Sequence, residues 1–351
     1  MPTVAVDINP ATRPVITGTE RYTREVCARL PALAPDLDWK FFSSRAKPGL
    51  GVDVTVVPFR RMWSQVRLPI ELVGVRPDLL FVPGHSVPFA WMGRSLAVIH
   101  DLAFERHPEA YGTASRLHLQ LTTRWAVNRC RLLITVSEST RDDLVQLYGA
   151  DPQRIRVVPN GGGEEPHVQP ASMSRLAELG LTGDFILQVG RVETRKNQVA
   201  SLAAVERVPG MTLALAGPVT DSSLASRLRR SPSVRVLGRV DDATLELLYR
   251  AAKAVVVPSL YEGFGIPVLE AMSRGQVVVA ARTSSLPEVG GDAILYVDDP
   301  ADADAFASVL KTIGDGKART AMTRRAIARA REFTWDRCAA GVAAVVREAL
   351  S

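Results

Sequence analysis

Short apolar runs rich in β-branched residues alternate with longer amphipathic segments along the whole chain. In the first half the runs are residues 3–6, 39–43, 54–58, 79–82, 96–99, 132–136 and 155–158, and in the second half they are residues 185–189, 212–216, 234–237, 254–257, 277–281 and 294–297. Strands separated by helices form right-handed βαβ units with parallel strands. The pattern therefore predicts an α/β chain with two consecutive parallel sheets.

A polar stretch from Pro159 to Pro166 separates the two series of strands. Its prolines and glycines suit neither helix nor strand, so it is the expected hinge between two domains. A chain of 351 residues is long enough for two ordinary domains. We expect the first at residues 1–165 and the second at residues 166–333. The amphipathic segment 334–351 has no strand after it, and we expect a helix there that packs back on the first domain.

Composition narrows the classes of partner. The 43 Lys and Arg against 37 Asp and Glu give a net charge of +6, without long basic runs. This balance permits anionic ligands but does not favour nucleic acid. Cys27, Cys130 and Cys338 lie far apart, as expected for reduced, buried thiols rather than disulfides or a metal site. The sequence contains no stretch of about 18 apolar residues and no signal-peptide layout at its N-terminus, so we expect a soluble, cytoplasmic protein.

The stretch from Ser259 to Glu270 places two acids on either side of a glycine-rich turn. Gly263 and Gly265 lack a Cβ and allow a ligand to approach the main-chain N–H groups closely. Pro267 is typical of a first helical turn, so a helix is expected to begin at the turn and to favour phosphate or carbohydrate oxygens.

The two acids, Glu262 and Glu270, can each accept paired hydroxyl hydrogens, the first from a hexose and the second from a ribose. A purely structural alternative exists. Ser259 followed by Glu262 matches a capping box, and Glu270 near a helix start is compatible with the helix dipole.

Polar residues also follow several other strands of both series, and ligands of open parallel sheets bind at these carboxyl ends. His100 follows the run 96–99, and Arg191 and Lys196 follow the run 185–189. The two cations could bracket a diphosphate. The alternative for them is a solvated charged loop, because Glu193 is close in sequence, and for His100 it is a capping or core-edge role beside Asp101.

Taken together, these motifs resemble those of a retaining glycosyltransferase of family GT4 with the GT-B fold, over nearly the whole chain. The motifs are Thr17-Gly18-Thr19-Glu20-Arg21-Tyr22, Ile99-His100-Asp101-Leu102, Val136-Ser137-Glu138-Ser139, Val158-Pro159-Asn160-Gly161, Val189-Gly190-Arg191 with Lys196-Asn197, Leu237-Gly238-Arg239-Val240-Asp241, and the two acids Glu262 and Glu270. The resemblance implies two Rossmann-like domains that face each other across a cleft.

The resemblance also implies roles for these residues. Arg191 and Lys196 would hold the donor diphosphate and stabilise the leaving nucleotide, while His100 would reach the hexose from the first domain. The remaining predicted donor contacts are Gly18, Thr19, Gly190, Gly238, Arg239, Val240, Glu262, Gly263, Phe264, Gly265, Ile266 and Glu270. His100, Arg191, Lys196 and Glu262 are the predicted catalytic set. The loop at Gly18 departs from the common family pattern, because Thr19 and Glu20 stand where many relatives have spaced glycines, and a bulkier loop would narrow the acceptor cleft.

The expected reaction moves a hexose from a nucleoside diphosphate sugar to a glycan or lipid-linked glycan, with retention of anomeric configuration. Mannose from GDP-mannose is the leading donor, on the likeness to mannosyltransferases of surface polysaccharide assembly. Two cations can stabilise the departing diphosphate, so no cofactor and no metal are expected. No residue is a clear covalent nucleophile.

Four other functions are alternatives to this one. A metal-dependent transferase would need an Asp-x-Asp motif, but Asp36-Leu-Asp38 and Asp302-Ala-Asp304 are interpreted better as turn and cap acids. A dehydrogenase would need G-x-G-x-x-G after a first strand, which is absent. A GT-B sugar-nucleotide epimerase and a non-enzymatic sugar-nucleotide-binding protein share the expected pocket and stay open.

Peripheral contact with the inner face of the plasma membrane is a further hypothesis. Residues 59–63 with Arg67, and residues 89–94, place aromatic side chains beside basic ones in the first domain. The favoured alternative is that these aromatics belong to a packing cluster or to the acceptor site.

Overall fold

The computed structural model describes residues 1–13, 18–46, 49–59, 62–164, 168–314 and 316–351. The chain divides into two compact units, one made of Met1–Gly161 with Thr334–Ser351 and the other of Gly162–Phe333. We call them unit 1 and unit 2. The sequence-based boundary between residues 165 and 166 lies outside the described residues.

Unit 1 contains a seven-stranded sheet in the order β3-β2-β1-β4-β5-β6-β7, with every pair parallel. The strands are β1 (Thr3–Asp7), β2 (Asp38–Ser43), β3 (Val54–Val56), β4 (Leu79–Val82), β5 (Ser95–Ile99), β6 (Leu132–Thr135) and β7 (Ile155–Val157). The helices are α1 (Gly18–Leu33), α2 (Leu68–Val75), α3 (Ala103–Arg106), α4 (Thr113–Arg129), α5 (Glu138–Tyr148) and α14 (Trp335–Leu350), and a π-helical turn (Trp63–Arg67) precedes α2.

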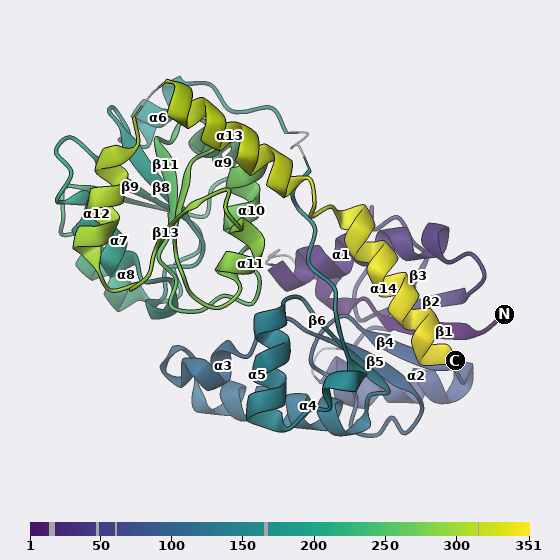
Figure 1. The fold of residues 1–351 in the computed structure, drawn as a ribbon. Helices are drawn as coiled ribbons and strands as arrows, with labels where there is room; N and C mark the ends of the chain where they lie inside the picture. The colour runs from purple at the N-terminus through teal and green to yellow at the C-terminus, as the bar shows by residue number, and fades with distance from the viewer. Residues whose placement is uncertain (14–17, 47–48, 60–61, 165–167, 315) are drawn as a thin grey trace. The chain divides into compact units, whose positions relative to one another are not determined.

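Unit 2 contains a six-stranded parallel sheet in the order β10-β9-β8-β11-β12-β13. The strands are β8 (Phe185–Val189), β9 (Thr212–Ala216), β10 (Val234–Gly238), β11 (Ala254–Val257), β12 (Val278–Ala281) and β13 (Leu295–Val297). The helices are α6 (Ser174–Glu178), α7 (Gln198–Val205), α8 (Ser222–Leu228), α9 (Asp242–Ala251), α10 (Ile266–Ser273), α11 (Leu286–Gly290), α12 (Ala303–Thr312) and α13 (Lys317–Ala330). Figure 1 shows helices flanking each sheet.

These sheets confirm the α/β fold with two Rossmann-like parallel sheets. Every run predicted from the sequence forms a strand, and its ends move by two residues at most. The central strands are the easiest to recognise because helices cover both of their faces, so that almost every side chain is apolar and buried, as in β4, β5 and β11.

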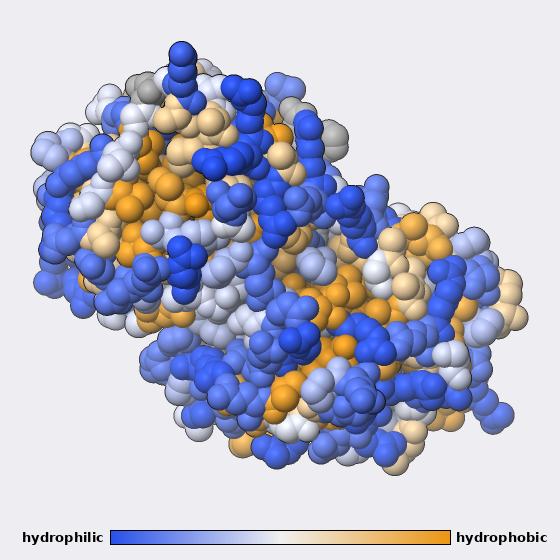
Figure 2. Space-filling model, in the orientation of Figure 1, coloured by the Kyte–Doolittle hydropathy of each residue, from blue (hydrophilic) through white to orange (hydrophobic). Residues whose placement is uncertain are grey.

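The C-terminal helix α14 belongs to unit 1 and packs against α1. Val342, Val346 and Ala349 are buried on its inner face. Ion pairs fasten its outer side, from Arg347 to Asp36 and from Arg29 to Asp336. Figure 2 shows that hydrophilic side chains are spread over the visible surface of both units rather than gathered on one of them.

Candidate functional site

The centre of the site in unit 2 forms where the loops after β8 and β11 meet. These two strands are neighbours in the sheet, so the loops at their carboxyl ends lie side by side. The backbone N–H of Leu260 donates to the carbonyl oxygen of Arg195 at 2.9 Å and joins the two loops. This contact brings Lys196, from the first loop, to Glu262, in the second.

Lys196 and Glu262 form a buried ion pair, with 2.5 Å between Nζ and Oε1. Their side chains are 12% and 8% exposed. The hydroxyl of Ser259 donates to the same carboxylate oxygen at 2.7 Å. Arg195, which is 11% exposed, lies 3.5 Å from Oε2. Burial by itself raises the pKa of Glu262, but the two cations and the hydrogen bonds outweigh it and lower that pKa below its usual value.

Two interpretations from the sequence are wrong here. The solvated charged loop offered as the alternative for Arg191 and Lys196 is wrong for Lys196, because Lys196 and its neighbour Arg195 are largely buried and bonded to Glu262, whereas Arg191 is exposed. Ser259 is not the first residue of a capping box, because α10 begins only at Ile266 and the Ser259 hydroxyl contacts a side chain instead.

A third loop, after β12, supports the main chain of the second. The backbone N–H of Glu262 donates to the hydroxyl of Ser284 at 2.8 Å, and the hydroxyl of Ser285 donates to the carbonyl oxygen of Glu262 at 2.9 Å. The hydroxyl of Thr283 donates to the carbonyl oxygen of Ser259 at 2.7 Å. Glu262 is therefore held through both its backbone and its side chain, which favours a fixed carboxylate position.

The glycine-rich turn delivers the chain into α10 as the sequence predicts. Gly265 has a φ of 108° and precedes the first helical residue, Ile266, and Pro267 lies in the first turn. Phe264 is buried and packs edge-on against Phe333, with ring centroids 5.7 Å apart. Gly263 lies buried between Glu262 and Phe264. The predicted helix start at this turn is confirmed.

Glu270 lies farther along α10, where its Oε2 accepts a hydrogen bond of 2.9 Å from the hydroxyl of Tyr249. Tyr249 is fully buried on α9, the helix that follows the predicted base-contact residues. Gly238 ends β10 with a φ of 68°, Arg239 is exposed, and Val240 is half-buried. Helix α9 therefore follows the segment predicted to line the base and, through Tyr249, contacts the acid predicted to bind the ribose.

Arg191 differs from Lys196 because its side chain is exposed. Its backbone is fixed, since buried Gln198 donates through Nε2 to the Arg191 carbonyl oxygen at 2.7 Å. Gly190 before it has a φ of 142°. A Cβ on Gly217 would lie only 2.0 Å from the Gly190 oxygen, so Gly217 allows the loop after β9 to approach the Arg191 segment.

In unit 1, His100 directly follows the last residue of β5. Burial lowers its pKa, although a contact with Pro83 and the nearby Asp101 carboxylate partly oppose that effect. The ring Nε2 donates to the Pro83 carbonyl oxygen at 3.0 Å, which leaves Nδ1 as an acceptor. The Asp101 carboxylate accepts a hydrogen bond of 3.0 Å from the backbone N–H of Ala103, the first residue of α3.

His100 and the predicted glycine loop meet through Tyr22. The Tyr22 ring is buried edge-on against His100, with centroids 4.8 Å apart, and lies one turn after Gly18 and Thr19 in α1. Gly18 is exposed and Thr19 half-buried at the start of that helix. Thr17, the first residue of the motif, lies outside the described residues. Unit 1 therefore places its predicted donor contacts close together.

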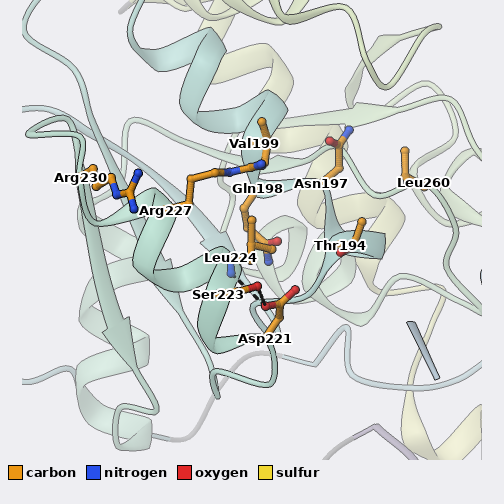
Figure 3. Close-up of a pocket in the computed structure, with 10 residues that line it drawn as sticks. All are labelled: Thr194, Asn197, Gln198, Val199, Asp221, Ser223, Leu224, Arg227, Arg230 and Leu260. Atoms are coloured by element: carbon orange, nitrogen blue, oxygen red, sulfur yellow. Dashed lines mark hydrogen bonds between the residues drawn. The ribbon is translucent and has the colours of Figure 1, made fainter. Parts of the chain in front are cut away.

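A pocket of about 510 Å³ lies in unit 2 beside the loop after β8, which carries Arg191 and Lys196, as Figure 3 shows. It is lined by Thr194, Asn197, Gln198, Val199, Asp221, Ser223, Leu224, Arg227, Arg230 and Leu260. These residues come mainly from α7, α8 and the loops before them. Gln198 lines the pocket and donates to the Arg191 carbonyl oxygen, so this side of the pocket supports the loop that carries Arg191.

Three contributors were not identified from the sequence as parts of the site: Arg195, Gly217 and Tyr249. The position of Arg195 beside Lys196 is a sequence signal for a role in the site, but the burial of Arg195 does not follow from the local sequence. Tyr249 and Gly217 have no such signal in the sequence, since each contacts a residue more than twenty positions away. In the described part of the chain, no group of three or more His, Cys, Asp or Glu side chains is arranged to hold a metal ion.

Comparison with known proteins identifies the class of this chain. Residues 177–332 match the family model described as glycosyl transferases group 1, and residues 16–161 match that of glycosyltransferase family 4. The structure is similar to that of HepE from Anabaena in complex with UDP and glucose, with a TM-score of 0.76 and 19% identity over 99% of this chain and 100% of that one. The fold is that of the GT-B glycosyltransferases.

Sequence relatives give the family. The chain is 32% identical to the O-antigen chain mannosyltransferase B of Escherichia coli over 260 residues, which cover 70% of this chain and 68% of that protein. It is 34% identical to the D-inositol 3-phosphate glycosyltransferase of Segniliparus rotundus over 59% of this chain, but spans only half of that protein. The chain belongs to glycosyltransferase family 4.

Proposed function

We propose that this glycosyltransferase moves a hexose from a nucleoside diphosphate sugar to a glycan or lipid-linked glycan, with retention of anomeric configuration and without a metal. Mannose from GDP-mannose is the leading donor. The similarity to an O-antigen chain mannosyltransferase supports mannose and a glycan acceptor. The observation that carries the proposal is the buried pair of Lys196 and Glu262 at the carboxyl ends of β8 and β11.

The chemistry follows from the charges at this position. Breaking the bond between the sugar and the diphosphate leaves a sugar with oxocarbenium character and an anionic nucleotide. Arg191, which is exposed, and Lys196, whose side chain is 12% exposed, would stabilise that anion as it forms. Glu262 would accept hydroxyl hydrogens of the hexose, and Glu270 those of the ribose.

The first experiment is a thermal-shift screen of GDP, UDP, ADP and CDP against the purified chain. A nucleotide at 100 times its dissociation constant should stabilise the fold by about 2.7 kcal/mol. We expect GDP to give the largest shift. A larger shift with UDP would replace mannose as the leading donor sugar but keep the transferase, whereas no shift with any nucleotide would contradict the proposal.

The second experiment measures transfer. GDP-mannose is incubated with a glycan acceptor and the product linkage is assigned by NMR, with and without EDTA. An α-linked product, formed at an unchanged rate in EDTA, is expected. A β-linked product would contradict retention, loss of activity in EDTA would contradict metal independence, and isomerised donor without transfer would favour an epimerase.

A specific surface favours peripheral membrane binding as an accompanying property. Val66 on the π-helical turn and Ile70 and Val73 on α2 recur every three or four residues and are 41%, 55% and 70% exposed, and Met62, directly before the turn, is 67% exposed. Such a stripe can enter the headgroup region of a membrane that carries a lipid-linked acceptor. Arg60 and Arg61 beside it lie outside the described residues. None of the helices in the described residues is both long and apolar enough to cross a membrane.

Sedimentation with anionic liposomes at low salt tests this property. Wild type is expected in the pellet, and the double variant Ile70→Glu with Val73→Glu in the supernatant. Val199→Glu, an exposed apolar position of unit 2, serves as the control and should sediment like wild type. Equal sedimentation of all three proteins would contradict the proposal.

A further inference from the structure

A buried carboxylate connects α9 to the end of α10 in unit 2. Glu246 on α9 is 1% exposed and binds two arginines, with 2.6 Å to Nε of Arg250 and 2.7 Å to Nε of Arg274. A buried acid is stable only when it is paired, so the pair restricts where Arg274 can lie. Arg274 follows α10 directly, and its side chain is 12% exposed.

Arg274 in turn contacts both Tyr249 and Glu270. Its guanidinium lies 4.6 Å from the centroid of the Tyr249 ring, which suits a cation–π contact. Its Nη1 donates to the Glu270 carbonyl oxygen at 2.7 Å. Tyr249 is fully buried and donates its hydroxyl to Glu270 Oε2 at 2.9 Å. Glu246 and Tyr249 are three residues apart and lie on one face of α9.

We propose that Tyr249 and Arg274 are positioning residues that give this site its preference for a ribose over a deoxyribose. The inference rests on the proposed function, in which Glu270 binds the ribose hydroxyls. A glutamate side chain has several rotamers, and holding it in one before the ligand arrives reduces the entropy lost on binding. The Tyr249 hydroxyl fixes one carboxylate oxygen of Glu270 and so fixes the directions of the remaining lone pairs of that carboxylate.

The arrangement also explains why these contacts come from α9. The residues predicted to line the base, Gly238 to Val240, directly precede that helix, whose first turn is capped by Asp241. One rigid element therefore connects the predicted base contact to the acid predicted to bind the sugar attached to that base. A nucleoside with both ribose hydroxyls could contact the base segment and Glu270 together, whereas a nucleoside without these hydroxyls would lose the contact with Glu270.

The test compares dissociation constants for GDP and 2′,3′-dideoxy-GDP, and in parallel for UDP and 2′,3′-dideoxy-UDP, by calorimetry. Wild type should bind the ribose form at least ~10-fold more tightly, since hydrogen bonds to a charged group are strong. Tyr249→Phe keeps the ring under Arg274 and removes only the hydroxyl. This variant should reduce the preference at least ~3-fold, by weakening the ribose form alone.

Tyr148→Phe is the matched control. Tyr148 of unit 1 also donates its hydroxyl to a glutamate, Glu105, at 2.5 Å, and also lies under an arginine, with Arg124 at 5.5 Å from the ring centroid. Its substitution should leave the preference unchanged. Arg274→Lys keeps the charge beside Glu246 but loses the planar stack, and it should also reduce the preference, which supplies a second variant if Tyr249→Phe folds poorly.

The outcomes separate the inference from the proposed function. If wild type binds neither nucleotide, or binds ribose and dideoxyribose forms equally, the role of Glu270 in the proposed function fails and the inference fails with it. If wild type shows the preference and Glu270→Ala removes it, while Tyr249→Phe and Arg274→Lys keep it, only the inference is overturned. Equal weakening of both forms in these variants means a purely structural role and also overturns it.

Discussion

Lys196 and Arg191 are assigned the same chemical task in the proposed function, yet the structure predicts very different losses of stability when each is replaced by alanine. Lys196 lies in a buried ion pair with Glu262, whereas the Arg191 side chain is exposed and only its carbonyl oxygen is used in a described contact. Both substitutions should reduce turnover by about 10²-fold to 10³-fold, as the loss of one transition-state donor does.

The stabilities should differ strongly. Removing one partner of a buried pair costs about 3–5 kcal/mol, and we expect the lower end for Lys196→Ala because Arg195 and Ser259 still contact Glu262. For a unit of this size, about 3 kcal/mol corresponds to a melting temperature lower by roughly 6–12 °C. Arg191→Ala should stay within about 0.5 kcal/mol of wild type.

The pH dependence of this difference follows from the pKa of Glu262. Despite burial, which raises it, that pKa is lowered below 4.5 in the folded protein, chiefly by Lys196 and Arg195. A group with a depressed folded pKa contributes stability above its unfolded pKa and loses it as pH falls through the folded value. The gap between wild type and Lys196→Ala should therefore be full at neutral pH and shrink below about pH 4.5.

Differential scanning calorimetry of wild type and both variants, together with donor turnover, checks the reasoning. Far-UV circular dichroism confirms that each variant is folded. A Lys196→Ala protein as stable as wild type at pH 7 would refute the importance of the buried pair. Turnover unchanged in both variants would refute the assignment of these cations to the diphosphate.

Two other perturbations test a close backbone approach in unit 2 and a histidine of unit 1. In denaturant unfolding, Gly217→Ala should lower the free energy of unfolding by about 2 kcal/mol, because the new Cβ would lie 2.0 Å from the Gly190 oxygen. Gly183→Ala is the control and should be neutral, because its Cβ would have nothing within 4 Å. Equal stabilities of the two variants would contradict the close approach at Gly217. Burial lowers the pKa of His85 to about 4 from 6.5, so this group stabilises the fold above pH 6.5 and the contribution is lost as pH falls toward 4. The free energy of unfolding at pH 7 should exceed that at pH 5 by about 2 kcal/mol from this source, His85→Asn should lack that part, and exposed His118→Asn should keep it. An unaltered pH profile in His85→Asn would contradict the lowered pKa of His85.

The sequence predicts the sheets well because their cause is local. A buried central strand needs a continuous run of apolar residues, and each such run marks its own position, as residues 79–82 and 254–257 do. The same locality reveals Gly265 and Pro267, whose backbone requirements are properties of single residues. It also places Lys196 and Glu262 at strand ends, where loops of neighbouring strands meet.

The supporting contacts could not be predicted because they depend on register and helix packing. Whether Arg195 faces solvent or Glu262 depends on the bond between its carbonyl oxygen and Leu260, more than sixty residues away. Whether Tyr249 reaches Glu270 depends on how α9 packs beside α10. In a sequence, a buried tyrosine on an amphipathic helix cannot be distinguished from an ordinary core residue.

The pairing of Lys196 with Glu262 has a consequence for how the site could accept a diphosphate. A phosphate that draws the ammonium toward itself removes the nearest countercharge of a buried carboxylate, which would be costly if Lys196 were its only partner. Arg195 resolves this difficulty. It bonds Tyr261 O at 2.6 Å and Glu193 at 2.8 Å, so it is fixed in place while it lies 3.5 Å from Glu262. In the proposed reaction, Lys196 would therefore be able to turn toward the diphosphate while Arg195 continues to balance the charge of Glu262.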